Sequence, residues 1–312
     1  MNITKKKTAM GTASGKIILI GEHAAVYGHP AIAIPCTAVQ THVNISPAKN
    51  GLYLYCDLYE GLIDDMPELL TGLKTIINAT LYYLNQEHTP LHIRIESSIP
   101  SERGMGSSAA VSCAIVRSLC QYFNKSITTK ELIHLVQIAE KIVHGNPSGL
   151  DATIISTETP LFFEKGKPFK KISINTTGYL VIADTGLTGQ TKQAIEKVAT
   201  LKKVAPKTHT SIMTTLSNMT HRVTHYLATN QLHALGQTMT HAHHALQKLG
   251  VSHPLLDQLV SLSLEHGALG AKLTGGGLGG CMIALAKTKQ DADALRCILL
   301  SKGAKQAFVQ PL

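Results

Sequence analysis

The sequence predicts a mixed protein of β-strands and α-helices that is divided into two domains. Short runs that are apolar, or that alternate between apolar and polar residues, are typical of strands; "KIILI", "LHIRIES" and "YLVIAD" are examples. Longer stretches with apolar residues at helical spacing follow "GMGSS" and Thr128. The composition changes near residue 176, so we expect one domain over residues 1–176 and a second over residues 177–312.

The individual elements follow from local signals. Residues 17–20 read as a short buried strand, and "LHIRIES" has its apolar residues at alternate positions, which turns them to one face of a sheet. A helix is expected from about residue 109 to residue 123. The next helix begins after Thr128, because Thr128 and Glu131 have the spacing of a capping box. Between this region and the C-terminal glycine run, residues 190–249 are mostly helical.

The bulk composition is that of a globular protein. Of the 312 residues, 44% are hydrophobic and 16% are charged, which excludes a disordered chain. The formal net charge of +9 suits anionic ligands, although it equally describes a generally basic soluble protein. Aromatic residues make up only 4% and Trp is absent, whereas nucleic-acid binding usually combines a basic stripe with aromatic side chains. We therefore expect no nucleic-acid partner.

The sequence also predicts a soluble, cytoplasmic protein with no membrane partner. The N-terminal "MNITKKKTAMGTASGK" is charged but is not followed by the apolar run of a signal peptide. No apolar stretch approaches the roughly 20 residues that span a bilayer. The six cysteines contain no CxxC pair, so we expect reduced core cysteines rather than a disulfide framework or a zinc site; they are Cys36, Cys56, Cys113, Cys120, Cys281 and Cys297.

The first candidate site is the stretch "ERGMGSSAAVSC". Glycines that enter a helix N-terminus can expose several unpaired backbone N–H groups, to which the helix dipole adds partial positive charge. Gly104 and Gly106 could let a phosphate approach the main chain, and Ser107 and Ser108 add hydroxyls. The alternative is an ordinary turn in which a serine caps the helix. A Walker A loop is not expected, because the nearest match, "GTASGKI", spaces its glycines one residue too closely and lacks the hydroxyl after Lys16.

The second candidate site is "AEKIVHGNPSGLDA". Glu140 falls at the margin of an apolar helix face, roughly 40° beyond Val136, and is either an ordinary boundary residue or a half-buried carboxylate that reaches a cation. Asp151 follows a loop of turn-forming residues and is either a helix cap or a catalytic carboxylate. The apolar face is expected to comprise Leu132, Leu135, Val136, Ala139, Ile142 and Val143.

The third candidate site is "KLTGGGLGGC", whose five glycines in six positions exceed the need of a hairpin. Such a run indicates either close approach to a ligand or a tight turn packed on another domain. By contrast, the histidines of "HAHHAL" lack the i, i+4 spacing of a helical zinc motif. We expect His241, His243 and His244 to lie on a solvated or domain-facing helix surface.

Together, in this order, these stretches resemble the GHMP kinase superfamily, which phosphorylates small-molecule hydroxyls with ATP. The three superfamily motifs match "SGKIILIGEHAAVYG", "IPSERGMGSSAA" and "KLTGGGLGGC". Within the superfamily, "GEHAAVYG", "AEKIVHGNPSGLDA" and "LGVSHPLLDQL" look like the mevalonate kinase family. The resemblance implies an α+β, two-domain fold. Its N-terminal domain is like domain 2 of ribosomal protein S5, its C-terminal α/β domain is ferredoxin-like, and the active site lies in the cleft between them.

The resemblance also implies a role for each matching residue. Asp151 is implied as the catalytic aspartate, with Lys16 as its basic partner, and Ser108 and Glu140 as ligands of Mg²⁺. The ATP-binding residues implied are Arg103, Gly104, Met105, Gly106, Ser107, Ser108 and Ala109. The substrate-binding residues implied are Lys16, Glu22, His23, Asp151, Thr191 and Gly276.

The chain departs from the family pattern at several positions. Ser14 stands where the family usually has Pro, and Met105 where it has Leu. Leu278 adds a Cβ within the glycine run, where the family has "GAGGGG" and this chain has "GGGLGG". An arginine in the substrate pocket of some members has no counterpart, and Gly189 stands near its position.

The activity implied is ATP-dependent phosphorylation of the 5-hydroxyl of (R)-mevalonate, which gives 5-phosphomevalonate and ADP in isoprenoid biosynthesis. ATP and Mg²⁺ are the expected cofactors, and mevalonate is the expected small-molecule partner. The alternatives are phosphomevalonate kinase, homoserine kinase, or a nucleotide-binding regulator that has lost catalysis. The oligomeric state stays open, with a homodimer as one alternative.

Overall fold

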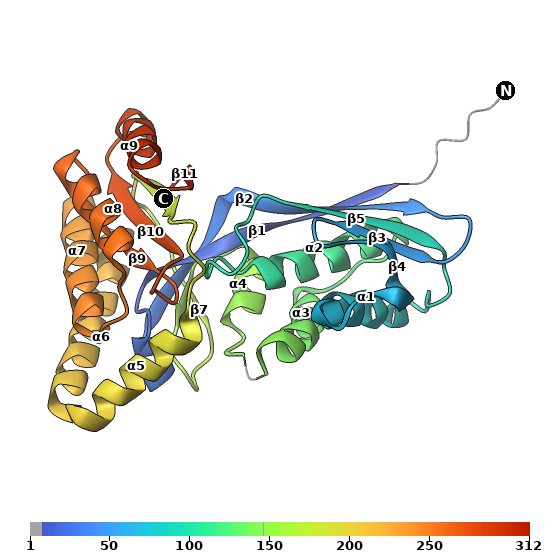
Figure 1. The fold of residues 1–312 in the computed structure, drawn as a ribbon, viewed down its shortest axis with the longest axis horizontal. Helices are drawn as coiled ribbons and strands as arrows, with labels where there is room; N and C mark the ends of the chain where they lie inside the picture. The colour runs from blue at the N-terminus through green and yellow to red at the C-terminus, as the bar shows by residue number, and fades with distance from the viewer. Residues whose placement is uncertain (1–7, 146) are drawn as a thin grey trace. The chain divides into compact units, whose positions relative to one another are not determined.

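The computed structural model describes residues 8–145 and 147–312, which divide into two compact units (Figure 1). Unit 1 comprises the described residues up to Gly15 together with Val39–Ile99 and Gly106–Glu158. Unit 2 comprises Lys16–Ala38, Pro100–Met105 and Thr159–Leu312. Each unit is assembled from separate stretches of chain, and the domain boundary near residue 176 stays a prediction. Two parts of the chain lie outside the described residues: residues 1–7, where the sequence predicts no signal peptide, and Asn146 of the second motif.

Unit 1 is built on a sheet whose strands run in the order β4-β3-β5-β2, with β1 paired to β2. β3 pairs with β4 in antiparallel and with β5 in parallel orientation, whereas β2 and β5 are antiparallel. The alternation predicted for "LHIRIES" is confirmed, because Leu91, Ile93 and Ile95 are buried. The strands are β1 (Ala9–Ile20) and β2 (Ala31–Pro47), each of which continues into unit 2, and β3 (Leu52–Cys56), β4 (Tyr59–Leu62) and β5 (Leu91–Ser97).

Four helices lie together on one face of this sheet (Figure 1). They are α1 (Thr71–Tyr83), α2 (Ser107–Tyr122), α3 (Thr129–His144) and α4 (Leu150–Thr157), and two short 3₁₀ turns, η2 (Ile63–Asp65) and η3 (Glu68–Leu70), precede α1. The predicted capping box of α3 is confirmed, since Glu131 N–H donates to Thr128 Oγ1 and Thr128 N–H donates to Glu131 Oε2. The expected apolar face is correct for the first three turns of α3. It is wrong at Ile142 and Val143, which are 53% and 50% exposed.

Unit 2 contains an antiparallel four-stranded sheet in the order β11-β8-β10-β9. Its helices α7 and α8 pack against β9, and α9 packs against β8 and β11. The first residues of β2 pair with β6, and β6 pairs with β7. The strands are β6 (Leu161–Phe163), β7 (Lys170–Lys171), β8 (Tyr179–Asp184), β9 (Gly270–Thr274), β10 (Cys281–Ala286) and β11 (Gln306–Pro311).

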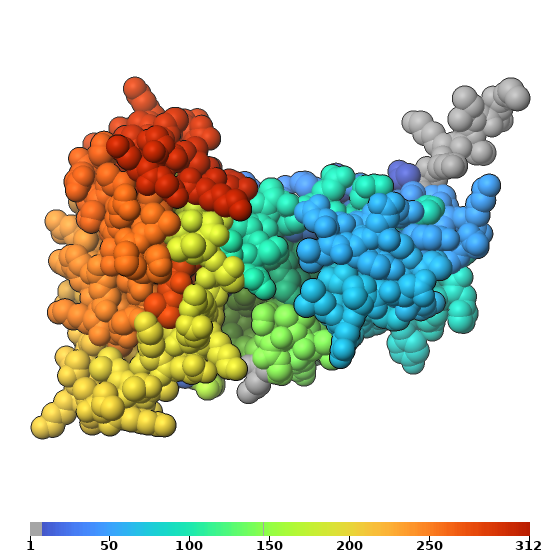
Figure 2. Space-filling model, viewed as in Figure 1, coloured from blue at the N-terminus to red at the C-terminus, as the bar shows by residue number. Residues whose placement is uncertain are grey.

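The helices of unit 2 confirm that residues 190–249 are mostly helical. They are η1 (Ala24–Tyr27), α5 (Thr191–Val204), α6 (Pro206–Ala228), α7 (Leu232–Lys248), α8 (Pro254–Glu265) and α9 (Lys289–Ser301). The outer surface of α5–α8 is the yellow-to-orange part of the space-filling view (Figure 2). Of the core residues, every side chain of β9 and β10 is buried, including the charged Lys272 in the middle of β9.

Two further findings concern the helices and the cysteines of the described residues. None of the helices described there has both the length and the apolar composition needed to cross a membrane. No disulfide joins the cysteines, all of which are among the described residues, and four of the six are buried as expected. Cys56 is half-buried and Cys297 is exposed, so these two are not core residues.

Candidate active site

The predicted phosphate loop leads directly into α2. Gly106 is the N-cap residue and adopts the left-handed conformation (φ 74°, ψ 28°), which favours glycine. Among the described residues, no side chain caps this helix. Ser107 and Ser108 are its first two helical residues, so the alternative in which a serine is the N-cap is wrong. The N–H groups of the first turn are therefore left for a ligand or for water.

The carboxylates predicted from the second motif lie at the ends of two helices that pack against α2 and against each other. Glu140 is in the penultimate turn of α3 and is only 4% exposed, and its Oε2 lies 3.7 Å from His144 Nε2. Asp151 is in the first turn of α4, after Gly149, and is half-buried. Unit 1 thus places the hydroxyl of Ser108 and the two carboxylates on three mutually packed helices.

Unit 2 holds the other predicted residues. Lys16, Glu22 and His23 come from the end of β1 and the turn that follows it, and all three are at least nine-tenths buried. The N–H of Lys16 donates to the carbonyl of Met105 at 2.9 Å. Lys16 belongs to unit 2 and Asp151 to unit 1, so their pairing stays a prediction.

His23 is joined to the C-terminal glycine run by a hydrogen bond. Its Nε2 lies 2.9 Å from the carbonyl oxygen of Gly276, although the two residues are 253 positions apart in sequence. His23 also has φ 59°, in the left-handed region that is uncommon for a residue with a side chain. The turn at His23 is therefore held in an unusual conformation by its surroundings.

The glycine run is explained by close packing within unit 2. A Cβ on Gly276 would clash with Oγ1 of Thr191, and one on Gly277 would clash with the carbonyl oxygen of Val251. The structure thus brings together three of the predicted substrate residues, His23, Thr191 and Gly276. The two alternatives for this run were close approach to a ligand and a tight turn packed on another domain. The close approach seen here is between segments of unit 2.

Leu278 shows how the departure from an all-glycine loop is accommodated. It adopts φ 55°, a conformation that costs about 1–2 kcal/mol in a residue with a Cβ. Its N–H donates to the carbonyl of Val251 at 2.8 Å, and its side chain is only 9% exposed. The backbone of the loop therefore keeps a glycine-like turn, and the side chain is buried within the unit.

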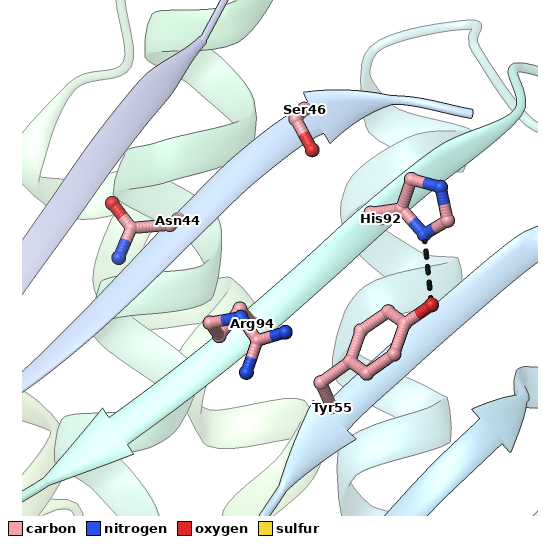
Figure 3. A pocket seen from close by; sticks show the side chains of 5 residues that line it. All are labelled: Asn44, Ser46, Tyr55, His92 and Arg94. Carbon is pink, nitrogen blue, oxygen red and sulfur yellow. Dashed lines mark hydrogen bonds between the residues drawn. The ribbon is translucent and has the colours of Figure 1, made fainter.

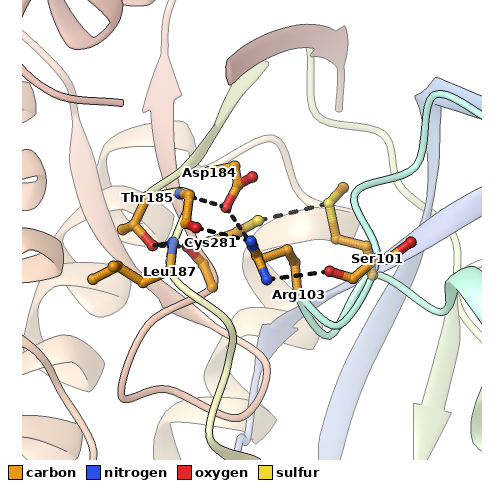
Figure 4. A network of polar contacts seen from close by, with 9 residues as sticks. Ser101, Arg103, Asp184, Thr185, Leu187 and Cys281 are labelled. Carbon is orange, nitrogen blue, oxygen red and sulfur yellow. Dashed lines mark hydrogen bonds and ion pairs between the residues drawn. The ribbon is translucent and has the colours of Figure 1, made fainter. Parts of the chain in front are cut away.

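Arg103 is engaged by groups of its own unit (Figure 4). Its Nε donates to Asp184 Oδ1 at 3.0 Å, and its terminal nitrogens donate to the carbonyls of Gly186 and Ser101 at 2.9 and 3.2 Å. The predicted ATP-binding role of Arg103 remains a prediction. What the geometry shows is an arginine that fixes the backbone just before the phosphate loop. Beside it, the sulfur of Met105 lies 3.7 Å from Cys281 Sγ.

A buried ion pair that the sequence did not reveal lies next to His23. Lys272 Nζ bonds to Glu22 Oε1 and also donates to the carbonyl of Leu273 at 2.6 Å. Burial lowers the pKa of Lys272 and raises that of Glu22, and each charge opposes the shift of the other. A lysine within the otherwise apolar strand "GALGAKLT" was the available signal, because a charged side chain is almost never fully buried without a partner.

The histidines of "HAHHAL" divide between the solvated and the domain-facing surface that were expected. His241 and His244 are exposed, but His243 is 1% exposed, because it points from α7 to the free edge of β9. Its Nδ1 accepts from the N–H of Leu273 at 3.3 Å, and its Nε2 lies 3.1 Å from Asp257 Oδ1. Burial lowers the pKa of His243 to about 4. The helical spacing could not show that this side chain satisfies an edge strand.

A separate polar depression lies on the other part of the chain, on the sheet of unit 1 (Figure 3). Its lining contains no residue predicted for the site. The Tyr55 hydroxyl lies 3.2 Å from His92 Nδ1, and the Arg94 guanidinium lies 5.0 Å from the centroid of the Tyr55 ring. Asn44 and Ser46 complete the lining.

Comparison with known proteins gives a consistent result for both parts of the chain. The model of the GHMP kinases N-terminal domain matches residues 73–158, and that of the GHMP kinases C-terminal domain matches residues 223–305. The mevalonate kinase of Pyrococcus furiosus is 30% identical over 311 residues, and the match covers 90% of each chain.

Solved structures agree with these matches. The mevalonate kinase from Staphylococcus aureus is 31% identical with a TM-score of 0.75, and covers 98% of this chain and 99% of its own. The L. major mevalonate kinase, solved in complex with R-mevalonate, is 26% identical with a TM-score of 0.83, and the match covers 99% and 96% of the two chains. The α+β, two-domain GHMP kinase fold is thereby confirmed. The chain belongs to the GHMP kinase superfamily, and it is similar to mevalonate kinases over nearly its whole length.

Proposed function

We propose that this protein is a cytoplasmic kinase that transfers the γ-phosphoryl group of ATP to the 5-hydroxyl of (R)-mevalonate. The observation that carries the proposal is the meeting, within unit 2, of His23, Gly276 and Thr191. The resemblance assigns these same residues to substrate binding. The similarity of the chain to mevalonate kinases along nearly all of its length supports the same acceptor.

The ATP phosphates would be held at the start of α2. Phosphates bind readily at a helix N-terminus, where free N–H groups and the helix dipole favour negative charge. The N–H groups of Ser107, Ser108 and Ala109 are in the first turn, and the left-handed Gly106 keeps a side chain away from the approach. Phosphoryl transfer depends mainly on such positioning and on neutralisation of charge.

The donor groups of unit 1 fit a magnesium ion. Mg²⁺ prefers oxygen ligands and usually takes only one or two from the protein, with phosphates and water supplying the rest. The hydroxyl of Ser108 and the buried carboxylate of Glu140 lie on the packed helices α2 and α3 and are oxygen donors of this kind. The described residues hold no group of three or more His, Cys, Asp or Glu side chains suited to a metal. When bound, Mg²⁺ would neutralise charge on the phosphates.

Asp151 and Lys16 would act on the acceptor hydroxyl. Asp151 would accept the proton of the 5-hydroxyl as that oxygen bonds to the γ-phosphorus, while the bond from the γ-phosphorus to the bridging oxygen of ADP breaks. Asp151 lies in the first turn of α4, near the helix N-terminus. Lys16, which the resemblance gives as the basic partner of Asp151, would lower the proton affinity of the hydroxyl.

A screen of acceptors coupled to ADP release tests the proposal. The protein is incubated with ATP–Mg²⁺ and, separately, with (R)-mevalonate, phosphomevalonate and homoserine. We expect the highest kcat/KM with (R)-mevalonate. Faster turnover of phosphomevalonate or homoserine would identify that compound, and not mevalonate, as the substrate. ATP binding without turnover of any acceptor would favour a nucleotide-binding regulator.

A further inference from the structure

The most unusual charged group in unit 2 is Lys272. It lies in the middle of β9, it is 0% exposed, and its ammonium group meets the equally buried carboxylate of Glu22, 250 positions away in sequence. Replacing such a pair by apolar residues of similar volume is often neutral or stabilising, so a buried ion pair is weak evidence for a role in stability. Its position therefore needs a different explanation.

The pair connects the two segments that meet at the predicted substrate residues. Glu22 immediately precedes His23, and Lys272 lies four residues before Gly276, the acceptor of the His23 hydrogen bond. A further contact joins the same segments, because Thr274 Oγ1 accepts from the N–H of Ile18 at 3.2 Å and donates to its carbonyl at 2.8 Å. The end of β1 and the turn that follows it are thus bonded to β9 and the glycine run at three places. These are Ile18–Thr274, Glu22–Lys272 and His23–Gly276.

The hydrogen bond to Gly276 determines which ring nitrogen of His23 carries the proton. The carbonyl of Gly276 can only accept, so Nε2 must carry the proton in the observed hydrogen bond. Burial lowers the pKa of His23; the hydrogen bond to Gly276 opposes this shift, and the charge of Lys272 adds to it. Neutral His23 therefore has its proton on Nε2, and Nδ1 is left as a hydrogen-bond acceptor.

The strand that carries Lys272 is itself held on its free edge. The N–H groups of Ala271 and Leu273, on either side of Lys272, donate to Thr240 Oγ1 and His243 Nδ1 of α7. Both edges of β9 are thus bonded, one to β10 and the other to α7. The ammonium group of Lys272 is anchored on a fixed strand, so it is Glu22 and its turn that the pair restrains.

We propose that Lys272 and Glu22 are positioning residues, which hold the turn at His23 against the glycine run and so fix the ring of His23 for the acceptor substrate. This inference deepens the proposed function and rests on it. Neither side chain needs to touch the substrate. Glu22, which the resemblance counts among the substrate-binding residues, acts through its neighbour.

The test combines spectroscopy of the free protein with kinetics. The double variant Glu22→Leu/Lys272→Met removes both charges and avoids leaving one of them buried alone. Glu22→Gln is the conservative variant, because a Gln oxygen still accepts from Lys272. Lys302→Met, at an exposed position of unit 2, is the matched control. The ¹⁵N shifts of the His23 ring are measured without substrate and are assigned by their loss in His23→Gln.

In the wild type and in Glu22→Gln, we expect the Nε2–H tautomer of His23, and in the double variant a mixture of tautomers. For the acceptor that the wild type uses best, kcat/KM should fall roughly tenfold to a hundredfold in the double variant, as when the outer partners of site residues are removed. The KM for ATP should stay within about twofold of the wild type. General loosening of the fold would not lower kcat/KM for the acceptor while leaving the KM for ATP unchanged.

The two readouts separate this inference from the proposed function. If mevalonate is not the acceptor, the proposed function fails, but the tautomer of His23 still tests the positioning role. Retention of the Nε2–H tautomer in the folded double variant overturns the proposal. So does a kcat/KM for the acceptor that stays within about twofold of the wild type.

Discussion

The two units build their parts of the candidate site in different ways. In unit 1, the proposed phosphate and metal groups lie at the ends of α2, α3 and α4, and Ser107, Ser108 and Asp151 are half-buried. In unit 2, the proposed substrate residues are held by contacts between segments about 250 residues apart, with a fully buried ion pair beside them. The groups proposed for phosphate thus come from local turns and are accessible, whereas the proposed substrate residues are held together by long-range buried contacts.

The largest effect is expected from the helix-end residues of unit 1. Asp151→Asn should lower kcat by roughly 10²–10⁴-fold, because the variant lacks a positioned proton acceptor, while ATP binding is kept. Steady-state kinetics and ATP titration measure both. The control is Asp64→Asn, an exposed carboxylate of the same unit. Near-normal turnover of Asp151→Asn would remove Asp151 from the mechanism and leave unit 1 with nucleotide binding alone.

The next effect concerns the buried pair of unit 2, and it is on stability. Lys272→Met leaves the Glu22 carboxylate buried without its partner, so the free energy of unfolding should fall by about 3–5 kcal/mol. Urea denaturation at pH 7 measures this. Lys302→Met, at an exposed position, should change it by no more than about 0.5 kcal/mol. Equal free energies of unfolding for Lys272→Met and Lys302→Met would contradict the description of Lys272 as a buried charge paired with Glu22.

A smaller effect is expected from His243 as the pH is lowered. Its pKa is lowered to about 4 in the folded protein from 6.5, so the unfolded chain binds a proton first. The contribution of neutral His243 to the free energy of unfolding is fully present above pH 6.5. It is lost as the pH falls from 6.5 to about 4, by up to about 3 kcal/mol.

His243→Gln should therefore have a flatter dependence of unfolding free energy on pH between 7 and 4 than the wild type. His241→Gln, an exposed position on the same helix, should leave that dependence unchanged. Urea unfolding at a series of pH values gives the comparison. A slope in His243→Gln equal to that of the wild type would show that His243 is not the buried neutral group described above.

The smallest effect concerns the glycine run. At φ 55°, Leu278→Gly should be more stable than Leu278→Ala by about 1 kcal/mol, because both variants lose the side chain but only Ala retains the Cβ. In strand β10 the order should reverse, with Leu285→Ala more stable than Leu285→Gly. Thermal or urea unfolding of the four variants measures the two differences. Equal stability of the two Leu278 variants would contradict the left-handed turn.

The same contrast explains how much could be predicted from the sequence. The capping box at Thr128, the strand "LHIRIES" and the helix after "GMGSS" depend on residues close in sequence, and all three are confirmed. The partners of Glu22 and His243 depend on which distant segments meet, and periodicity holds no information about this. Even for α3, the apolar spacing could not show that Ile142 and Val143, near its C-terminal end, are half exposed.

The most direct test of the account is a crystal structure of the protein with (R)-mevalonate and a non-hydrolysable ATP analogue with Mg²⁺. The account predicts mevalonate in contact with His23, Thr191 and Gly276, and the phosphates at the first-turn N–H groups of α2. It also predicts that the Glu22 and Lys272 side chains pair with each other and do not touch mevalonate. Mevalonate bound away from His23, or held directly by the Lys272 ammonium group, would contradict it.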